Sequence, residues 1–252
     1  MKTETIKHLN SRLTNLAFTL AETLIVIGII GVVAALTLPN LNHATGDKER
    51  VTRVKKIYSS LTEAFDRAEA IYGPIDEWRS DANNRVTAIT FGKRISEFMK
   101  ISKDCGSLAG QGCFASGKFK YLNGNEYGVS LDTLNSGTAY RFITSDGTSI
   151  LINQPPVDIL NIYVDIDGPN KGANKYGNDI FRFNVRYGST LTASSYSQIE
   201  PDGYNNTATQ MLINFRNTGN SGEPTAAWVL EYDNADYLKC LDSLSETKTS
   251  CN

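Results

Sequence analysis

Leu16-Ala-Phe-Thr-Leu-Ala-Glu-Thr-Leu-Ile-Val-Ile-Gly-Ile-Ile-Gly-Val-Val-Ala-Ala-Leu-Thr-Leu-Pro39 is the most informative segment of this 252-residue chain. The 21 residues from Phe18 to Leu38 include a single charged side chain, Glu22. As a helix rising about 1.5 Å per residue, they span roughly 32 Å, enough to cross a bilayer. A carboxylate inside a membrane helix costs about 2.5–3.5 kcal/mol by insertion scales, so we expect a cationic partner for Glu22 within the membrane.

The residues around this segment follow a known processing pattern. A short basic leader, a small residue, the sequence Phe-Thr-Leu-x-Glu and then an apolar run resemble the class III signal peptides of type IV pilins and pseudopilins. The resemblance implies that a prepilin peptidase cleaves between Ala17 and Phe18 and methylates the new amine of Phe18. The family usually has Gly before the cut, where this chain has Ala17.

The same resemblance implies an assembly role for two further residues. Glu22 would neutralise the N-terminal amine of a neighbouring subunit during filament assembly. Pro39 occupies the position at which many pilins have a helix-bending proline. The implied partners are the prepilin peptidase, other pilin or pseudopilin subunits, the filament assembly platform and the membrane.

Two simpler interpretations of residues 1–39 remain. A basic segment before an apolar run is also typical of an ordinary secretory signal peptide, but that peptide has an apolar region of only about 7–15 residues. An uncleaved membrane anchor fits the length of the run and leaves Glu22 unexplained. The resemblance implies a single-pass protein of the bacterial inner membrane with an extracytoplasmic head, although basic residues beside the span do not by themselves choose this orientation.

Helical periodicity continues beyond the apolar run and predicts one long helix over residues 18–72, with residues 18–38 transmembrane and some loosening after Pro39. Gly73-Pro74 then ends the helix. The predicted organisation is a leader (1–17), this helix (18–72) and a globular head (73–252). In the C-terminal half of this predicted helix, apolar residues recur at three- and four-residue steps, at Val51, Val54, Ile57, Tyr58, Leu61, Phe65, Ala68 and Tyr72.

The head is predicted to be rich in β-structure. A hairpin turn is expected at Ser145-Asp146-Gly147-Thr148 and a second short helix at Ile89–Ile101. A helix followed by antiparallel strands predicts the α+β class. The resemblance implies the pilin-like fold, in which the long helix packs on an antiparallel sheet. The predicted strands are Glu126–Leu131, Ala139–Thr144, Ser149–Asn153, Ile159–Asp165, Ile180–Val185 and Ala227–Tyr232.

All four cysteines follow the apolar segment, at positions 105, 113, 240 and 251. They allow three connectivities, of which we predict nearest-neighbour pairing, Cys105 with Cys113 and Cys240 with Cys251. Disulfides are expected in an extracytoplasmic head, whereas free thiols would indicate a reducing compartment.

A loop rich in Asp, Asn and Gly follows the strand predicted at Ile159–Asp165. Asp165, Asp167, Asn170 and Asp179 supply the hard oxygen ligands that Ca²⁺ prefers, which makes them candidate metal ligands. The spacing is not that of an EF-hand. The same residue types also form turns without any metal, and on that interpretation the protein has no cofactor.

Enzymatic and nucleic-acid functions find little support. The chain has two histidines, His8 and His43, so a histidine-based catalytic triad in the head is excluded. Its formal net charge of −2 does not predict a broad basic surface for nucleic acid. The sequence therefore predicts a non-enzymatic structural subunit, a minor pilin or pseudopilin of a type IV filament or type II secretion system. The alternative is an anchored protein that never polymerises and has a binding, adhesin or enzymatic head.

Overall fold

The computed structural model describes residues 20–83, 85–171, 174–188, 197–219 and 221–251, and it leaves out the side chains of residues 34 and 36–45. Contacts divide the chain into two compact units, Met1–Thr45 and Gly46–Asn252. The predicted leader (1–17) lies outside the described residues, as do Ala17 and Phe18.

The first helix, α1, is assigned without interruption over Leu20–Tyr72. It therefore passes position 39 as helix, and the predicted loosening after Pro39 does not appear in its assignment. The predicted end is confirmed. Gly73 follows in a left-handed conformation with φ of 78°, which glycine adopts without a Cβ penalty, and Pro74 cannot continue the helix.

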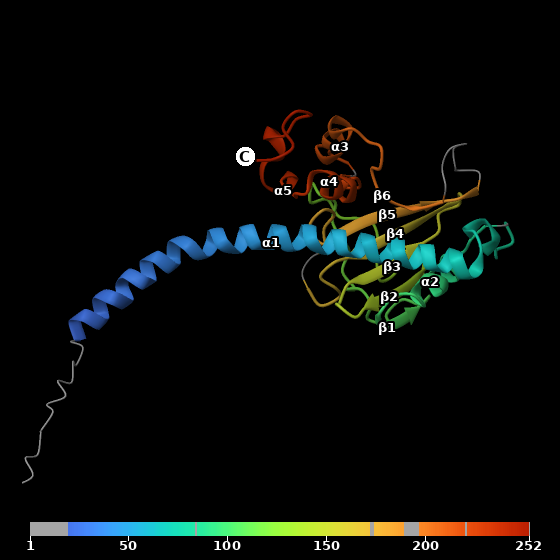
Figure 1. Ribbon diagram of the computed structural model, residues 1–252, viewed down its shortest axis with the longest axis horizontal. Coiled ribbons are helices and arrows are strands. Elements are labelled where there is room, and N and C mark those ends of the chain that lie inside the picture. The colour runs from blue at the N-terminus through green and yellow to red at the C-terminus, as the bar shows by residue number, and fades with distance from the viewer. Residues whose placement is uncertain (1–19, 84, 172–173, 189–196, 220, 252) are drawn as a thin grey trace, which may run out of the picture. The chain divides into compact units, whose positions relative to one another are not determined.

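One antiparallel sheet forms the centre of the Gly46–Asn252 unit (Figure 1). Within the described residues it has six strands, which pair in chain order from β1 to β6. The predicted hairpin turn is confirmed between β2 and β3, where Gly147 has φ of 88°. The strands are β1 (Ile101–Gly106), β2 (Tyr140–Thr144), β3 (Ser149–Asn153), β4 (Ile159–Asp165), β5 (Ile180–Arg186) and β6 (Ile199–Pro201).

The two edge strands of this sheet are irregular. β1 pairs with β2 through two register shifts, one between Ile101 and Lys103 and one between Asp104 and Gly106. β6 is three residues long and ends in Pro201. The regular ladders are the inner ones, from β2 to β5.

Strand alternation gives the sheet two different faces. From Gly46 to its end at Tyr72, α1 lies across the first face of the sheet and buries its predicted apolar stripe there (Figure 1). The sheet residues on that side are apolar: Tyr140, Phe142, Ile150, Ile152, Leu160, Ile162, Val164, Phe181, Phe183 and Val185. The second face is also covered but includes buried polar side chains, among them Arg141, Ser149, Asn153, Asp165 and Asn184.

Among the described residues there are four further α-helices: α2 (Ala88–Ser96), α3 (Ala208–Phe215), α4 (Thr225–Tyr232) and α5 (Tyr237–Cys240). Of these, α2 packs near β2 and β3, and α4 packs near β5 and β6. The short helix predicted at Ile89–Ile101 is α2, and it ends five residues earlier than expected because Ile101 already belongs to β1. The strand predicted at Ala227–Tyr232 is wrong, since this segment is α4. A short run that is apolar apart from Glu231 does not fit one period better than the other, so periodicity cannot separate a helix from a strand here.

The strand predicted at Glu126–Leu131 is also wrong. Only one isolated bridge, between Lys120 and Glu126, forms there. The Tyr127 ring stacks on Phe119 with centroids 4.2 Å apart, and the Ser130 hydroxyl accepts from the Thr133 amide. These local contacts stabilise a turn in place of a ladder.

Candidate functional site

The N-terminal part of α1 exposes many large apolar side chains. Nine of them between Leu20 and Val33 are 52–80% exposed: Leu20, Leu24, Ile25, Val26, Ile27, Ile29, Ile30, Val32 and Val33. Exposed apolar surface of this extent on one element is typical of a surface that another apolar partner covers. In the part of the chain that the structure describes, no helix meets the length and hydropathy that crossing a bilayer requires.

Glu22 lies in the first turn of α1 and is exposed. An acidic side chain at this end is favourable, because the helix N-terminus bears a partial positive charge. Pro39 lies within the helical span of α1, but its side chain is outside the described residues.

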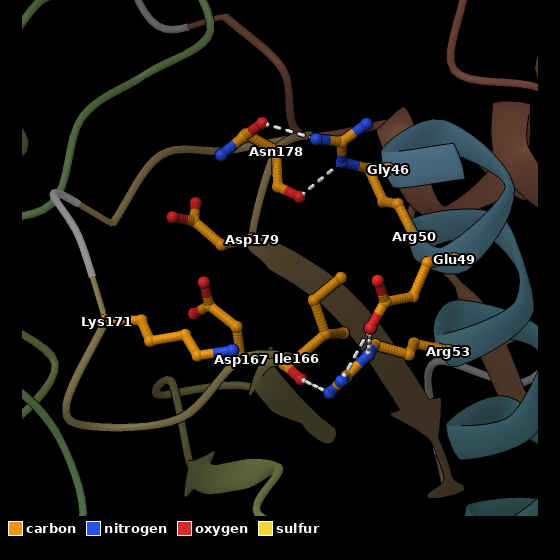
Figure 2. A pocket seen from close by; sticks show the side chains of 9 residues that line it. All are labelled: Gly46, Glu49, Arg50, Arg53, Ile166, Asp167, Lys171, Asn178 and Asp179. Carbon is orange, nitrogen blue, oxygen red and sulfur yellow. Dashed lines mark hydrogen bonds and ion pairs between the residues drawn. The ribbon is translucent and has the colours of Figure 1, made fainter. Parts of the chain in front are cut away.

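Three of the four predicted metal ligands meet between β4 and β5. Asp165 ends β4, while Asp167 and Asp179 line a cavity of about 160 Å³ against α1 (Figure 2). In the figure the carboxyl groups of Asp167 and Asp179 lie one above the other, both directed away from α1. Asn170 is exposed and does not line the cavity.

Neutral donors organise the carboxylates of this segment. Asp165 is fully buried, and its Oδ1 accepts from the amides of Asp167 (3.2 Å) and Gly168 (3.0 Å). Its Oδ2 accepts from Nδ2 of Asn174 at 3.3 Å. Asp179 Oδ1 accepts from the Lys175 amide at 2.5 Å. These bonds fold the Asp- and Gly-rich segment into consecutive turns.

Burial makes the charged forms of two of these groups unfavourable. It raises the pKa of Asp165 to about 8, and the neighbouring carboxyl group of Asp167 adds to the rise. Burial also raises the pKa of Asp179 to about 6, with the charge of Asp167 again contributing. A nearby positive charge would oppose both shifts.

Two arginines of α1 hold both ends of this segment (Figure 2). Arg50 donates from Nε to the Asn178 carbonyl and from a terminal nitrogen to its Oδ1, both at 2.7 Å. Arg53 donates to the Ile166 carbonyl at 2.9 Å. The helix thus contacts the residues directly preceding Asp167 and Asp179.

Sequence reasoning did not identify Arg50, Arg53 or Asn174 as parts of this site. The two arginines belong to a mixed-charge helical stretch in which nothing distinguishes them. Asn174 could have been included, because it is a further amide in the same polar loop. No three His, Cys, Asp or Glu side chains among the described residues are arranged to hold a metal ion by themselves.

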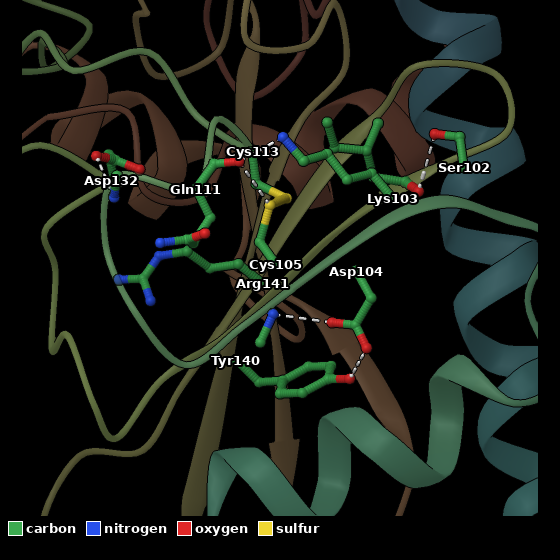
Figure 3. The surroundings of a disulfide bond; sticks show 12 residues. Ser102, Lys103, Asp104, Cys105, Gln111, Cys113, Asp132, Tyr140 and Arg141 are labelled. Carbon is green, nitrogen blue, oxygen red and sulfur yellow. Dashed lines mark hydrogen bonds between the residues drawn. A yellow bond between two sulfur atoms is a disulfide. The ribbon is translucent and has the colours of Figure 1, made fainter.

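Two disulfides are present, with the predicted nearest-neighbour pairing. Cys105 bonds to Cys113 and Cys240 bonds to Cys251. Figure 3 shows the first of them beside the buried Arg141, whose guanidinium donates to the carbonyls of Leu131 (3.2 Å) and Ser107 (3.1 Å) and also to that of Leu134. This single side chain attaches the loop after β1 and the turn before β2 to the sheet.

A larger cavity, about 510 Å³, lies where α1 meets the segment after β6. Its lining combines aromatic rings (Tyr58 and Tyr204) with an apolar side chain (Leu230) and polar ones (Asn205 and Glu231). Such a mixture suits a small-molecule ligand in size and chemistry.

Comparisons with known proteins return no counterpart for this chain. It matches no protein-family model, no curated protein and no solved structure.

Proposed function

We propose that this chain is a structural subunit, a minor pilin or pseudopilin, of a type IV filament or type II secretion system. The observation that carries this proposal is the exposed apolar surface of α1 between Leu20 and Val33, which includes Glu22 as its only charged residue. A surface of this kind requires lipid or other apolar helices around it.

The proposed mechanism has three stages. A prepilin peptidase removes residues 1–17 and methylates the amine of Phe18. The processed subunit is stored in the bacterial inner membrane through its apolar helix, with the Gly46–Asn252 unit outside the cytoplasm. The assembly platform then moves it into a filament, where apolar helices of several subunits bury one another.

In this filament Glu22 sets the register between subunits. Its carboxylate pairs with the methylated amine of Phe18 on an adjacent subunit. An ion pair surrounded by apolar side chains is screened little by solvent, so a mismatched register would leave two buried charges uncompensated.

Two features of the head support the proposal. A long helix packed on an antiparallel sheet is the architecture that the resemblance to pilins implies. Its two disulfides suit an oxidising, extracytoplasmic compartment.

The 510 Å³ cavity beside Tyr58 favours a second candidate, an anchored binding protein that never polymerises. In that case the cavity holds the ligand, and Glu22 is dispensable. The two candidates therefore differ in what they require of the N-terminal helix.

The first test is the intact mass and N-terminal sequence of the protein from its native membrane. A chain that begins at N-methylated Phe18 is expected. A chain that still begins at Met1 would contradict prepilin processing and favour a simple anchor.

The second test is the variant Glu22→Ala. Its control is Glu63→Ala, at an exposed position in the C-terminal half of the same helix. We expect Glu22→Ala to reduce incorporation into filaments at least tenfold while membrane insertion persists, and Glu63→Ala to assemble normally. Incorporation is measured as the amount of protein in sheared filament fractions. Normal incorporation of Glu22→Ala would overturn the pairing with Phe18.

A further inference from the structure

The loop after β6 forms one wall of the 510 Å³ cavity beside Tyr58, and contacts with the rest of the head hold this loop in place. Asp202, at its start, forms a salt bridge with Arg182 of β5 at 2.5 Å. The next residue, Gly203, packs so closely on Pro224 that a Cβ at this position would lie 2.4 Å from the proline Cβ. A loop anchored in this way presents its side chains before a ligand arrives, which lowers the entropic cost of binding.

Three side chains of the same loop have unused hydrogen-bonding groups. Tyr204 is 48% exposed, and its hydroxyl forms no hydrogen bond with the described part of the chain. Asn205 and Asn206 are also exposed, and among the described residues their side-chain amides have no hydrogen-bond partner either. Because all three residues line the cavity, these donors and acceptors are available to a ligand in it.

Two helices form the rest of the lining. On α1, the ring of Tyr58 is held by Phe183, on which it stacks with centroids 5.7 Å apart and planes at 14°. On α4, Ala227 and Leu230 add apolar surface. Among the described residues that line the cavity, Glu231 is the only charged one.

This lining disfavours two classes of ligand. An anion such as a phosphate ester would meet no lysine, arginine or histidine in the described lining and would lie beside the carboxylate of Glu231. A purely apolar ligand would remove water from the amides of Asn205 and Asn206 without replacing its hydrogen bonds, which costs free energy. The lining suits a neutral molecule that combines an apolar face with many hydroxyl groups.

We propose that this cavity binds a neutral saccharide, one or two sugar rings of a glycan. One face of a pyranose ring consists largely of C–H groups and can stack on the exposed ring of Tyr204. Its hydroxyl groups both donate and accept hydrogen bonds, as do the amides of Asn205 and Asn206. The cavity volume lies within the range of roughly 300–1,000 Å³ that is typical of small-molecule sites. This inference goes beyond the proposed function and holds for a filament subunit and for an anchored binding protein alike.

A quaternary ammonium ion is the competing ligand, because tyrosine rings and a carboxylate also attract cations. The carboxylate in question, that of Glu231, is exposed, so water and salt screen its attraction. A quaternary ammonium ion also has no hydrogen-bond donor or acceptor for the amides of Asn205 and Asn206. The saccharide therefore uses more of the lining.

The test uses the full-length chain with its disulfides intact, purified in a polyoxyethylene detergent because glucoside and maltoside detergents would compete for the site. Glucose, galactose, mannose, N-acetylglucosamine, maltose, cellobiose, lactose and chitobiose are titrated by calorimetry, with choline as the comparison. We expect at least one saccharide to bind, one molecule per chain, with a Kd on the order of 1 mM. Absence of binding by all eight up to about twenty times that concentration would overturn the proposal, as would binding of choline alone.

The variants locate the site. Tyr204→Ala removes the stacking surface at an exposed position and should weaken saccharide binding by about tenfold or more, whereas Tyr204→Phe keeps the ring and most of the affinity. Asn205→Gly removes one amide where φ is 65°, a conformation that glycine adopts without strain, and should weaken binding severalfold. The control is Ile213→Ala, an exposed position on α3 outside the cavity lining, which should bind normally. Undiminished binding by Tyr204→Ala, with its folding checked by thermal unfolding, would overturn the assignment to this cavity.

Discussion

Two consecutive stretches of α1 contact the same head in different ways. Between Val54 and Ala68 the contact is apolar, with Val54, Leu61, Phe65 and Ala68 buried against the sheet. Between Asp47 and Arg53 the contact is mainly polar, although Val51 is also buried there. Arg50 and Arg53 bond to the β4–β5 segment, and Asp47 pairs with Lys239 beside the C-terminal disulfide.

The apolar and the polar contact should respond differently to the salt concentration of the solution. Apolar burial depends on area and packing and is nearly independent of ions. Polar contacts are weaker overall, because the groups form hydrogen bonds with water when they separate. The charged ones also weaken as the salt concentration rises. The apolar stretch therefore provides most of the stability, and the polar stretch is the part of the attachment that solution conditions can change.

Breaking the apolar stretch should have the largest effect. Phe65 is 1% exposed and packs against Trp78 and Phe91, with ring centroids 6.0 and 5.9 Å away. Phe65→Ala should lower the free energy of unfolding by about 3–5 kcal/mol, because it leaves a cavity. Urea denaturation measures the loss, and Ile71→Ala, at an exposed position of the same helix, should stay within about 0.5 kcal/mol.

Breaking the polar stretch should have an intermediate effect. Arg50→Met removes the two bonds to Asn178 and the ion pair with Asp47, and should cost about 1.5–3 kcal/mol in the same assay. Arg50→Lys retains the charge without the planar fork, so it should recover only part of the loss. A lysine variant as stable as the wild-type chain would show that charge alone matters here.

The smallest effect should come from a polar contact that faces solvent. Arg67 pairs with Glu63 at 2.5 Å, and their side chains are 59% and 62% exposed. Arg67→Ala should cost about 0.5 kcal/mol or less, and nothing measurable at about 1 M salt, where charges are screened within roughly 3 Å. A larger, salt-resistant loss would mean that Arg67 has another partner.

The inner part of the sheet was predictable because β3 and β4 are rich in Ile, Leu, Val and Tyr and are bounded by turn residues. The short elements were not. β1 contains two register shifts, and α4 is apolar from Ala226 to Leu230, with Glu231 as its only charged residue. α3 was missed although Thr207 and Gln210 form a capping box, a signal that the sequence does contain.

The candidate site was predictable only where its residues are neighbours in sequence. Asp165, Asp167 and Asp179 lie at the end of one strand and in the loop after it, so the local composition was enough to predict them as neighbours. The hydrogen bonds of Arg50 with Asn178, the neighbour of Asp179, join residues 128 positions apart and could be found only from the fold. The metal role of Asn170 stays a prediction.

The irregular edges of the sheet affect how copies of this protein can associate. A sheet grows by edge-to-edge pairing when an outer strand offers a long, flat row of free backbone groups. Here the bulged β1 and the short, proline-ended β6 offer poor templates for another strand. These two edges therefore disfavour edge-to-edge growth of the sheet, and ordered association of copies would have to use other surfaces.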